Sequence, residues 1–259
     1  MSELMAGKKG LIMGVANKKS MAWNIAQKLD EAGAKLAFTY QDEETGERVI
    51  PLFEEIGADF YETLDVTDDE DFERVFAKLE KEFAGELDFI VHSIAGGPKR
   101  EDLKGKYMDT SRESFTKSLE ISVYSYVKAV QMAYPLLKES DSAAAITLSY
   151  YGAEKVVPNY NVMGVAKAAL ESSVQYLADD LGSDNIRINA LSPGPVLTRA
   201  ASGIGEFRQL LKEFKAKAPL ERLVDKDEVA NSALYLLSDL ASGVTGEIVH
   251  VDCGFNIEA

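Results

Sequence analysis

Short apolar runs alternate with longer segments of mixed polarity along almost the whole chain. A run of this length between turn residues is typical of a strand buried in a parallel sheet, and the longer segments are typical of helices. The predicted strands are residues 8–15, 35–40, 59–66, 87–94, 143–148, 186–191 and 246–251. The predicted helices are residues 21–32, 44–57, 68–83, 112–138, 158–181 and 227–238.

This alternation predicts the α/β fold class. We expect a single doubly wound, Rossmann-like domain over residues 1–259, with a seven-stranded parallel sheet flanked by helices. No linker, repeat or low-complexity tract interrupts the series, and the polar segment 98–111 is predicted to be an exposed loop. Ligands bind such sheets beyond the carboxyl ends of the strands, so candidate residues should lie there.

Composition narrows the class of protein. The chain has 259 residues, 46% of them hydrophobic, which suits one domain with a substantial core. A net charge of −15 argues against a nucleic-acid partner. The most apolar long run, 119–137, is interrupted by Glu120 and Lys128 and is too polar to span a membrane.

The amino terminus has no apolar core of signal-peptide length, and the single Cys253 excludes an internal disulfide. Both features favour a cytoplasmic location. No cluster of His, Cys or carboxylate residues has metal-ligand spacing, so no metal site is predicted. His92 and His250 fall within predicted strands, where we expect hydrogen-bonded core histidines.

The turn after the first strand matches the dinucleotide motif G-x-G-x-x-G only at Gly14. Gly14 permits a tight turn, Ser20 is a candidate cap of the first helix, and the N–H groups of Ser20 and Met21 can face a pyrophosphate. Taken alone, this turn is equally compatible with an ordinary strand–helix connection.

The second strand ends at Gln41, followed by carboxylates at 42–44. In dinucleotide folds this position meets the adenosine ribose, and a 2′-phosphate would need a cation. The nearest cation is Arg48, beyond the carboxylates. The pattern favours NADH over NADPH, with Gln41 as the ribose or adenine contact, whereas a merely solvated acidic turn would give no preference.

The strand at 143–148 leads to Tyr150, a glycine-containing loop and a helix that Pro158 is predicted to begin. On such a helix Tyr160 and Lys167, seven residues apart, share one face. A phenol beside an ammonium suits carbonyl chemistry: the lysine can hold a cofactor hydroxyl, and the tyrosine can donate to an oxygen that gains negative charge. The alternative is a half-buried aromatic beside a solvated amine.

Tyr150, Tyr160 and Lys167 stand within Ser-Tyr-Tyr-Gly-Ala-Glu and Pro-Asn-Tyr-Asn-Val-Met-Gly-Val-Ala-Lys. This order resembles the bacterial enoyl-[acyl-carrier-protein] reductases, the divergent branch of the short-chain dehydrogenase/reductase family, and the resemblance covers residues 7–257. The Tyr-x6-Lys spacing is specific, since the commoner short-chain dehydrogenases carry Tyr-x3-Lys. Met163 stands at that nearer position and has no proton to donate.

The resemblance implies reduction of the trans-2-enoyl thioester of acyl carrier protein by NADH, in the elongation cycle of fatty acid biosynthesis. Hydride addition at the β-carbon leaves an enolate, which Tyr160 stabilises or protonates while Lys167 holds the nicotinamide ribose. Tyr150 and Gly97 line the acyl site together with Tyr160. The other cofactor contacts implied are Asp65 and Val66 at the adenine, Ile94 beside the crevice, and Val196 and Thr198 at the nicotinamide.

Segment 199–222 carries six basic and three acidic residues, so its net charge is six minus three, +3, on a chain of −15. We expect a substrate-covering lid at about 196–220 whose basic rim meets the acidic carrier protein. The alternative is an ordinary amphipathic surface helix. The resemblance also implies a homotetramer assembled through helices 112–138 and 158–181.

Two rival functions have sequence criteria. A 3-ketoacyl-type reductase of the same superfamily would need Tyr at position 163, where Met163 stands. A non-catalytic dinucleotide-binding sensor would need neither Tyr160 nor Lys167. Both rivals retain the fold, so the site decides between them.

Overall fold

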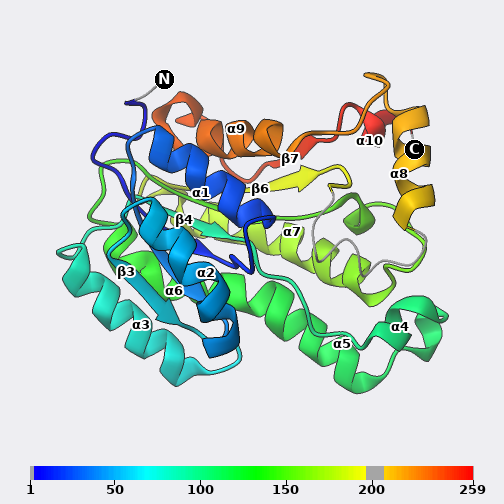
Figure 1. Cartoon of the computed structure of the whole chain (residues 1–259), viewed down its shortest axis with the longest axis horizontal. Helices are drawn as coiled ribbons and strands as arrows, with labels where there is room; N and C mark the ends of the chain where they lie inside the picture. The colour runs from blue at the N-terminus through cyan, green and yellow to red at the C-terminus, as the bar shows by residue number, and fades with distance from the viewer. Residues whose placement is uncertain (1–2, 197–206, 259) are drawn as a thin grey trace.

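The computed structural model describes residues 3–196 and 207–258. Seven parallel strands form one sheet in the order β3-β2-β1-β4-β5-β6-β7, which confirms the predicted fold class (Figure 1). The strands are β1 (Lys9–Met13), β2 (Lys35–Tyr40), β3 (Phe60–Thr63), β4 (Phe89–His92), β5 (Ala143–Leu148), β6 (Ile186–Pro193) and β7 (Ile248–Val251). The chain runs outward from β1 to β3 and then returns to β4, so the strand order reverses between β1 and β4.

Helices cover both faces of the sheet (Figure 1). The described helices are α1 (Met21–Glu31), α2 (Glu43–Glu55), α3 (Asp69–Glu82), α4 (Arg100–Lys104), α5 (Arg112–Leu119), α6 (Ser125–Leu137), α7 (Val162–Gly182), α8 (Phe207–Lys217), α9 (Lys226–Leu237) and α10 (Phe255–Glu258). Those that pack on the sheet carry a buried apolar face, whereas α4 has no buried residue. Most helices of this length would be only marginally stable in isolation, so the packing of these apolar faces against the sheet stabilises them.

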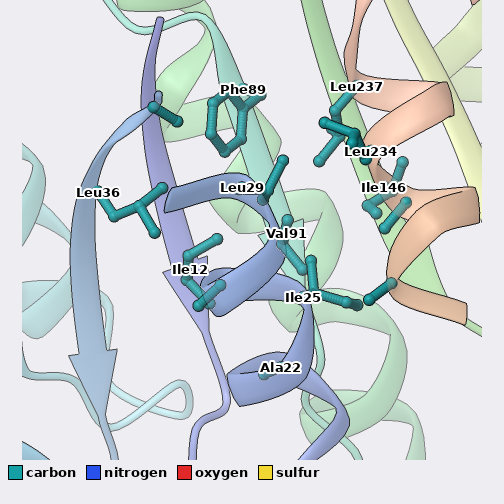
Figure 2. Packing of buried hydrophobic residues seen from close by; sticks show 14 of the residues in the cluster. Ile12, Ala22, Ile25, Leu29, Leu36, Phe89, Val91, Ile146, Leu234 and Leu237 are labelled. Atoms are coloured by element: carbon teal, nitrogen blue, oxygen red, sulfur yellow. The ribbon is translucent and has the colours of Figure 1, made fainter. Parts of the chain in front are cut away.

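The core is divided by the sheet into two layers, because successive strand residues point to opposite faces. Ile12 joins the layer under α1, α2 and α9, while its neighbours Leu11 and Met13 join the layer under α3, α6 and α7. In Figure 2, Ile25 and Leu29 of α1 lie among side chains of β1, β4 and α9. Because a core layer lies on each face of the sheet, the strands carry apolar residues on both faces.

Three predicted elements differ in the structure. The helix predicted from Pro158 begins only at Val162, because Asn159 and Asn161 have positive φ angles of 61° and 41° that no α-helix accommodates. The predicted loop 98–111 contains α4 and a 3₁₀ turn at Tyr107–Asp109. The predicted helix 112–138 is interrupted by a π-helical turn, Glu120–Tyr124.

Candidate functional site

Six candidate residues lie beyond the carboxyl ends of the strands, because the strands are parallel and each of the six follows a strand by one to three residues. Gly14, Gln41, Asp65, Ile94, Tyr150 and Val196 follow β1, β2, β3, β4, β5 and β6 respectively. The reversal between β1 and β4 lies within this row, and such a point opens a crevice for ligands in doubly wound sheets. Thr198 lies outside the described residues.

Gly14 lies where the ends of β1 and β4 approach each other. Its φ angle is +95°, and a Cβ atom there would overlap the carbonyl oxygen of Ser93 and lie 2.6 Å from the carbonyl carbon. The N–H of Ser93 donates to the carbonyl of Met13 at 3.0 Å, which holds the two strand ends at this spacing. Glycine at position 14 therefore lets the two strand ends approach closely, because a side chain there would overlap the Ser93 carbonyl.

The predicted capping of α1 by the Ser20 side chain is wrong. Its hydroxyl oxygen instead accepts the N–H groups of Ala16 at 3.0 Å and Asn17 at 3.1 Å. The Ser20 N–H donates to the Asn17 carbonyl at 3.0 Å. The residues between β1 and α1 thus fold back onto Ser20, which shapes the turn, and Met21 begins the helix with a buried side chain.

The acidic turn after β2 is organised around α2. Asp42 caps this helix by accepting the Thr45 N–H at 2.8 Å, and hydrogen bonds from Thr45 lower the pKa of the Asp42 carboxyl. Arg48 donates to Glu44 at 2.7 Å and to Thr45 at 3.2 Å. The guanidinium is therefore paired with residues of its own helix, and carboxylates separate it from Gln41 in the sequence, so a ribose hydroxyl is better matched than a phosphate at this position.

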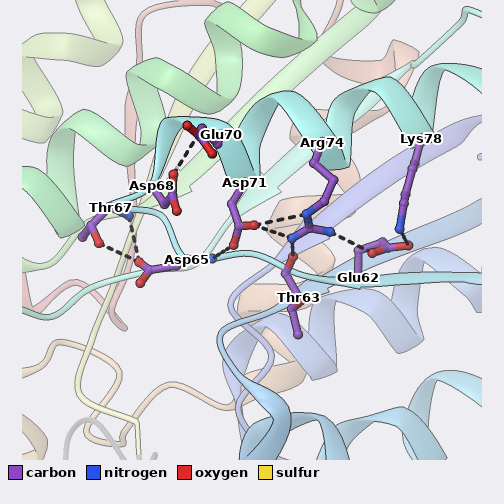
Figure 3. Close-up of polar contacts among 9 residues, drawn as sticks. All are labelled: Glu62, Thr63, Asp65, Thr67, Asp68, Glu70, Asp71, Arg74 and Lys78. Carbon is purple, nitrogen blue, oxygen red and sulfur yellow. Dashed lines mark hydrogen bonds and ion pairs between the residues drawn. The ribbon is translucent and has the colours of Figure 1, made fainter.

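The turn after β3 is held by Arg74 (Figure 3). Arg74 donates to Asp71 at 2.6 Å and to the Thr63 carbonyl at 2.7 Å, and its other nitrogen lies 3.0 Å from Glu62. The Asp65 N–H donates to Asp71 at 3.0 Å. These contacts fix the backbone at Asp65 and Val66, next to the position predicted for the adenine.

The segment after β4 is held by contacts with α5 and with the π-helical turn that follows it. The Ser122 hydroxyl accepts the Gly96 N–H at 3.0 Å and lies 3.1 Å from the Gly96 carbonyl oxygen. A Cβ atom at Gly97 would lie 2.5 Å from the Lys117 carbonyl carbon and oxygen. Gly97 therefore lets this segment lie directly against α5, and Ile94 packs on the core layer beneath it.

Tyr150 and Tyr160 are in ring contact, with centroids 4.9 Å apart and planes at 68°. Tyr160 precedes α7, so the predicted helical spacing from Tyr160 to Lys167 is wrong even though both face the end of β5. The Tyr160 ring is seated on Gly152, where a Cβ atom would lie 2.5 Å from its Cδ1. The Lys167 ammonium is buried and donates to the Leu148 carbonyl at 2.6 Å.

The electrostatics of this group suit proton donation. Burial raises the pKa values of the Tyr150 and Tyr160 phenols, which are therefore protonated at neutral pH. Burial lowers the pKa of Lys167 to about 8, and the negative charge of Glu171 opposes that shift. The Tyr150 hydroxyl is buried with no hydrogen-bond partner among the described residues. A buried polar group of this kind calls for a partner from outside the chain.

His92 is the predicted core histidine. Its side chain is fully buried, with Nδ1 at 3.0 Å from the Thr147 hydroxyl and Nε2 at 2.9 Å from the Ser125 hydroxyl. The same prediction for His250 is wrong: on edge strand β7 its ring stays partly exposed, and Nε2 lies 2.6 Å from a Glu154 carboxylate oxygen. A strand at the edge of a sheet has one uncovered side, which the sequence pattern does not reveal.

We expect His92 to make the protein sensitive to acid. Burial, with a smaller contribution from the Lys167 charge, lowers the pKa of His92 from 6.5 to about 3. The unfolded chain therefore binds a proton that the folded chain does not, and the free energy of unfolding falls by about 1.4 kcal/mol per pH unit below the unfolded pKa. Stability from this group is complete above pH 6.5 and is lost progressively as the pH falls toward about 3.

Urea unfolding at pH 7.5, 5.5 and 4.5 measures this effect. His92→Gln, which stays neutral and can still form hydrogen bonds, should show a shallower loss of unfolding free energy with acid than the unchanged protein. Carboxylates titrate equally in both chains, so the difference isolates the imidazole. Parallel curves for the two proteins would contradict the assignment.

Sequence reasoning missed three contacts around the tyrosines. The Ser149 hydroxyl donates to the Glu171 carboxylate. The Asn161 amide donates to the carbonyls of Asp102 at 3.0 Å and Gly105 at 2.8 Å, which ties the α4 segment to the start of α7. The spacing of Glu171 four residues after Lys167 was an available signal, since such pairs are neighbours on a helix.

The residues present fit a dinucleotide and a small carbonyl substrate. The turn at Gly14 allows backbone approach, Lys167 keeps donors beyond the one it uses, and the Tyr150 hydroxyl awaits a partner. Within the described part of the chain, no group of His, Cys or carboxylate side chains could hold a metal ion. No helix in that part is both long and apolar enough to cross a membrane.

Comparisons with known proteins agree with one another. The family model described as "Enoyl-(Acyl carrier protein) reductase" matches residues 14–256. The enoyl-[acyl-carrier-protein] reductase [NADH] 1 of Rhizobium meliloti (strain 1021) is 54% identical to this chain over 255 residues, which cover 98% of this chain and 92% of that protein.

Solved structures give the same result. The enoyl-(acyl-carrier-protein) reductase of Anaplasma phagocytophilum, crystallised in complex with NAD, has a TM-score of 0.94 at 50% identity, over 99% of this chain and 97% of that one. The Bacillus cereus enoyl-acyl carrier protein reductase, crystallised with NADP⁺ and an indole naphthyridinone, has a TM-score of 0.95 at 44% identity, over 99% of both chains. The likeness therefore extends over the whole fold.

Proposed function

Because this chain belongs to the enoyl-[acyl-carrier-protein] reductase family, we propose that it reduces trans-2-enoyl-[acyl-carrier-protein] to acyl-[acyl-carrier-protein] with NADH. This reduction of the enoyl thioester is one step of the elongation cycle of fatty acid biosynthesis. The observation that carries the proposal is the contact of Tyr150 with Tyr160 at the end of β5, beside the buried Lys167. That group suits a substrate oxygen that gains negative charge.

The bound cofactor supplies a hydride to the β-carbon of the substrate. Tyr160 then donates a hydrogen bond or its proton to the thioester oxygen, which carries the negative charge of the enolate, and a proton taken up from water at the α-carbon completes the acyl thioester. Its raised pKa keeps the phenol protonated, and the Tyr150 ring fixes its orientation. Lys167 holds the nicotinamide ribose with donors that Leu148 does not use. The unpartnered Tyr150 hydroxyl and the backbone at Gly97 line the acyl site.

Cofactor binding in this proposal follows the row of strand ends. Gly14, Ser20 and Met21 receive the pyrophosphate, and Gln41 meets the adenosine ribose. Because the Ser20 N–H is bonded to the Asn17 carbonyl, the donors are the Met21 N–H and the Ser20 hydroxyl. The other assigned contacts are Asp65 and Val66 at the adenine, Ile94 beside the crevice, and Val196 and Thr198 at the nicotinamide. The paired Arg48 supports NADH as the cofactor.

A substrate-covering lid at about 196–220 belongs to the proposal. Its described end, α8, packs through Phe214 against Tyr151 and Phe255, and Lys212, Lys215 and Lys217 lie on that helix. Arg222 is bound by Glu228 at 2.6 and 2.7 Å, so it contributes less to a basic rim.

Lys215→Glu should raise KM for an enoyl-[acyl-carrier-protein] but not for an enoyl-coenzyme A. Equal effects on the KM of both substrates would exclude the contact with the carrier protein.

We further propose a cytoplasmic homotetramer. Tyr124, Val165 and Tyr176 on the α5–α6 and α7 segments expose large apolar side chains, as a subunit interface would require. Sedimentation of the purified protein at monomer mass would exclude this assembly. Recovery in the membrane or secreted fraction of the cells that make it would exclude the location.

The test of the proposed function is NADH oxidation with a short trans-2-enoyl thioester. NADPH is the competing cofactor, because the Bacillus cereus relative was crystallised with NADP⁺. Turnover of the enoyl substrate with NADH is the expected result. Turnover of only a 3-ketoacyl thioester would make the protein the rival reductase, and cofactor binding with no turnover of either would make it a sensor.

A further inference from the structure

Two hydrogen bonds connect the carboxyl end of β5 to α7. The Lys167 ammonium donates to the carbonyl of Leu148 at 2.6 Å, and Ser149, the first residue after the strand, donates its hydroxyl to the Glu171 carboxylate. Lys167 and Glu171 are one helical turn apart, whereas Leu148 and Ser149 are consecutive. The bonds therefore fix both the height and the rotation of the strand end against the helix.

The strand end is also anchored on its other side. The Ser149 N–H donates to the Leu191 carbonyl of β6 at 2.7 Å, and the Ser149 side chain is 5% exposed. Tyr150 follows directly, and its ring contacts Tyr160. Any loosening at Ser149 would therefore be passed to the tyrosine pair through Tyr150.

Charged and titratable groups on four other segments of the chain face Glu171 or its neighbour Lys167. Burial raises the pKa of its carboxyl, and the hydrogen bond from Ser149 opposes that shift. The groups that face Glu171 or Lys167 are His92 of β4, Glu154 after Tyr151–Ala153, Tyr160 before α7 and His250 of β7. Of these, Glu154 and His250 are paired with each other at 2.6 Å.

We propose that Glu171 is a positioning residue: it holds the end of β5 against α7 through Ser149 and places a negative charge one turn from the Lys167 ammonium. The proposal deepens the reductase function proposed above and rests on it. In this proposal Glu171 acts on the reaction only through Ser149 and Lys167. A buried ammonium is held in its charged form by such a neighbour.

The key variant is Glu171→Gln, which keeps an oxygen acceptor for Ser149 but removes the charge. We expect kcat at the pH optimum to stay within about threefold, while the alkaline limb of the kcat/KM profile moves to lower pH because Lys167 loses its proton more easily. Glu171→Ala and Ser149→Ala remove the hydrogen bond and should each lower kcat about tenfold, as supporting partners of a site residue do.

A second readout does not depend on turnover. Hydrogen exchange of a peptide covering 143–151 should be faster in Glu171→Ala and Ser149→Ala than in the unchanged protein, and unaltered in Glu171→Gln. The double variant Ser149→Ala/Glu171→Ala should be no worse than either single variant, since both remove the same bond. Asp180→Asn, which removes an exposed carboxylate from the same helix, is the matched control and should change nothing.

The outcomes separate the inference from the function beneath it. If the unchanged protein fails to oxidise NADH with an enoyl thioester, the proposed function is wrong. If that protein is active and Tyr160→Phe impairs it, but Glu171→Gln keeps the same pH profile and the alanine variants keep normal exchange, only the role of Glu171 is wrong. An equal shift of the pH profile in Asp180→Asn would also overturn it.

Discussion

Replacing Tyr160 by phenylalanine is expected to lower kcat with a trans-2-enoyl thioester by about a hundredfold, the usual cost of losing a hydrogen-bond donor to a developing oxyanion. The phenylalanine ring can keep the contact with Tyr150 and the seat on Gly152, so the fold of the site should be retained. KM for NADH should stay within about twofold, because the loss is confined to the transition state. Steady-state NADH oxidation measures both quantities.

Tyr150→Phe is the matched control, since it removes the other phenol of the same ring pair. Its hydroxyl has no partner among the described residues, so its removal should raise the free energy of unfolding of the free protein by about 1 kcal/mol. The loss in kcat should be below about tenfold. A larger loss for Tyr150→Phe than for Tyr160→Phe would exchange the roles assigned to the two residues.

Replacing Gly14 by alanine is the second change with a large expected effect. The new methyl group would overlap the Ser93 carbonyl, and both groups belong to strand ends that are held together by the Ser93–Met13 hydrogen bond. Neither backbone can move away without breaking the sheet at its crevice. We expect the free energy of unfolding to fall by about 3 kcal/mol or more and NADH affinity to fall with it.

Gly85→Ala separates overlap from backbone strain. Gly85 has a similar φ angle of +83°, but a Cβ atom there would meet nothing within 4 Å. That control should cost only about 1–2 kcal/mol, the penalty of an L-residue in a left-handed conformation. Urea unfolding measures stability, and titration calorimetry with NADH measures affinity. Equal losses in the two variants would show that close packing against Ser93 is unimportant.

The elements that sequence predicted best are the buried strands. Residues 35–40 and 143–148 match β2 and β5 at both ends. A strand buried on both faces must be apolar along its length, so the local sequence shows where it begins and ends. The cap of α9 is an equally local contact, because Asp225 accepts the Asp227 N–H only two residues away.

Predictions failed where contacts outside the predicted element override a local preference. Pro158 favours a helix start, yet Asn161 is held out of the helix by its bonds to Asp102 and Gly105. Ser20 is a good capping residue, yet its hydroxyl serves the turn before it. His250 lies in an apolar strand, but that strand is at the edge of the sheet.

Local periodicity of the sequence predicts the layered α/β fold, and the shared direction of parallel strands predicts the side of the sheet at which the site lies. The candidates Tyr150, Tyr160 and Lys167 come from their order along the chain, which resembles the reductase family, since the helical spacing expected between Tyr160 and Lys167 is wrong. The contact of Tyr160 with Tyr150 from a turn before α7 and the bond from Ser149 to Glu171 emerge only in the folded chain. The reason is that these contacts join segments whose relative height and rotation are set by packing of the whole sheet against its helices.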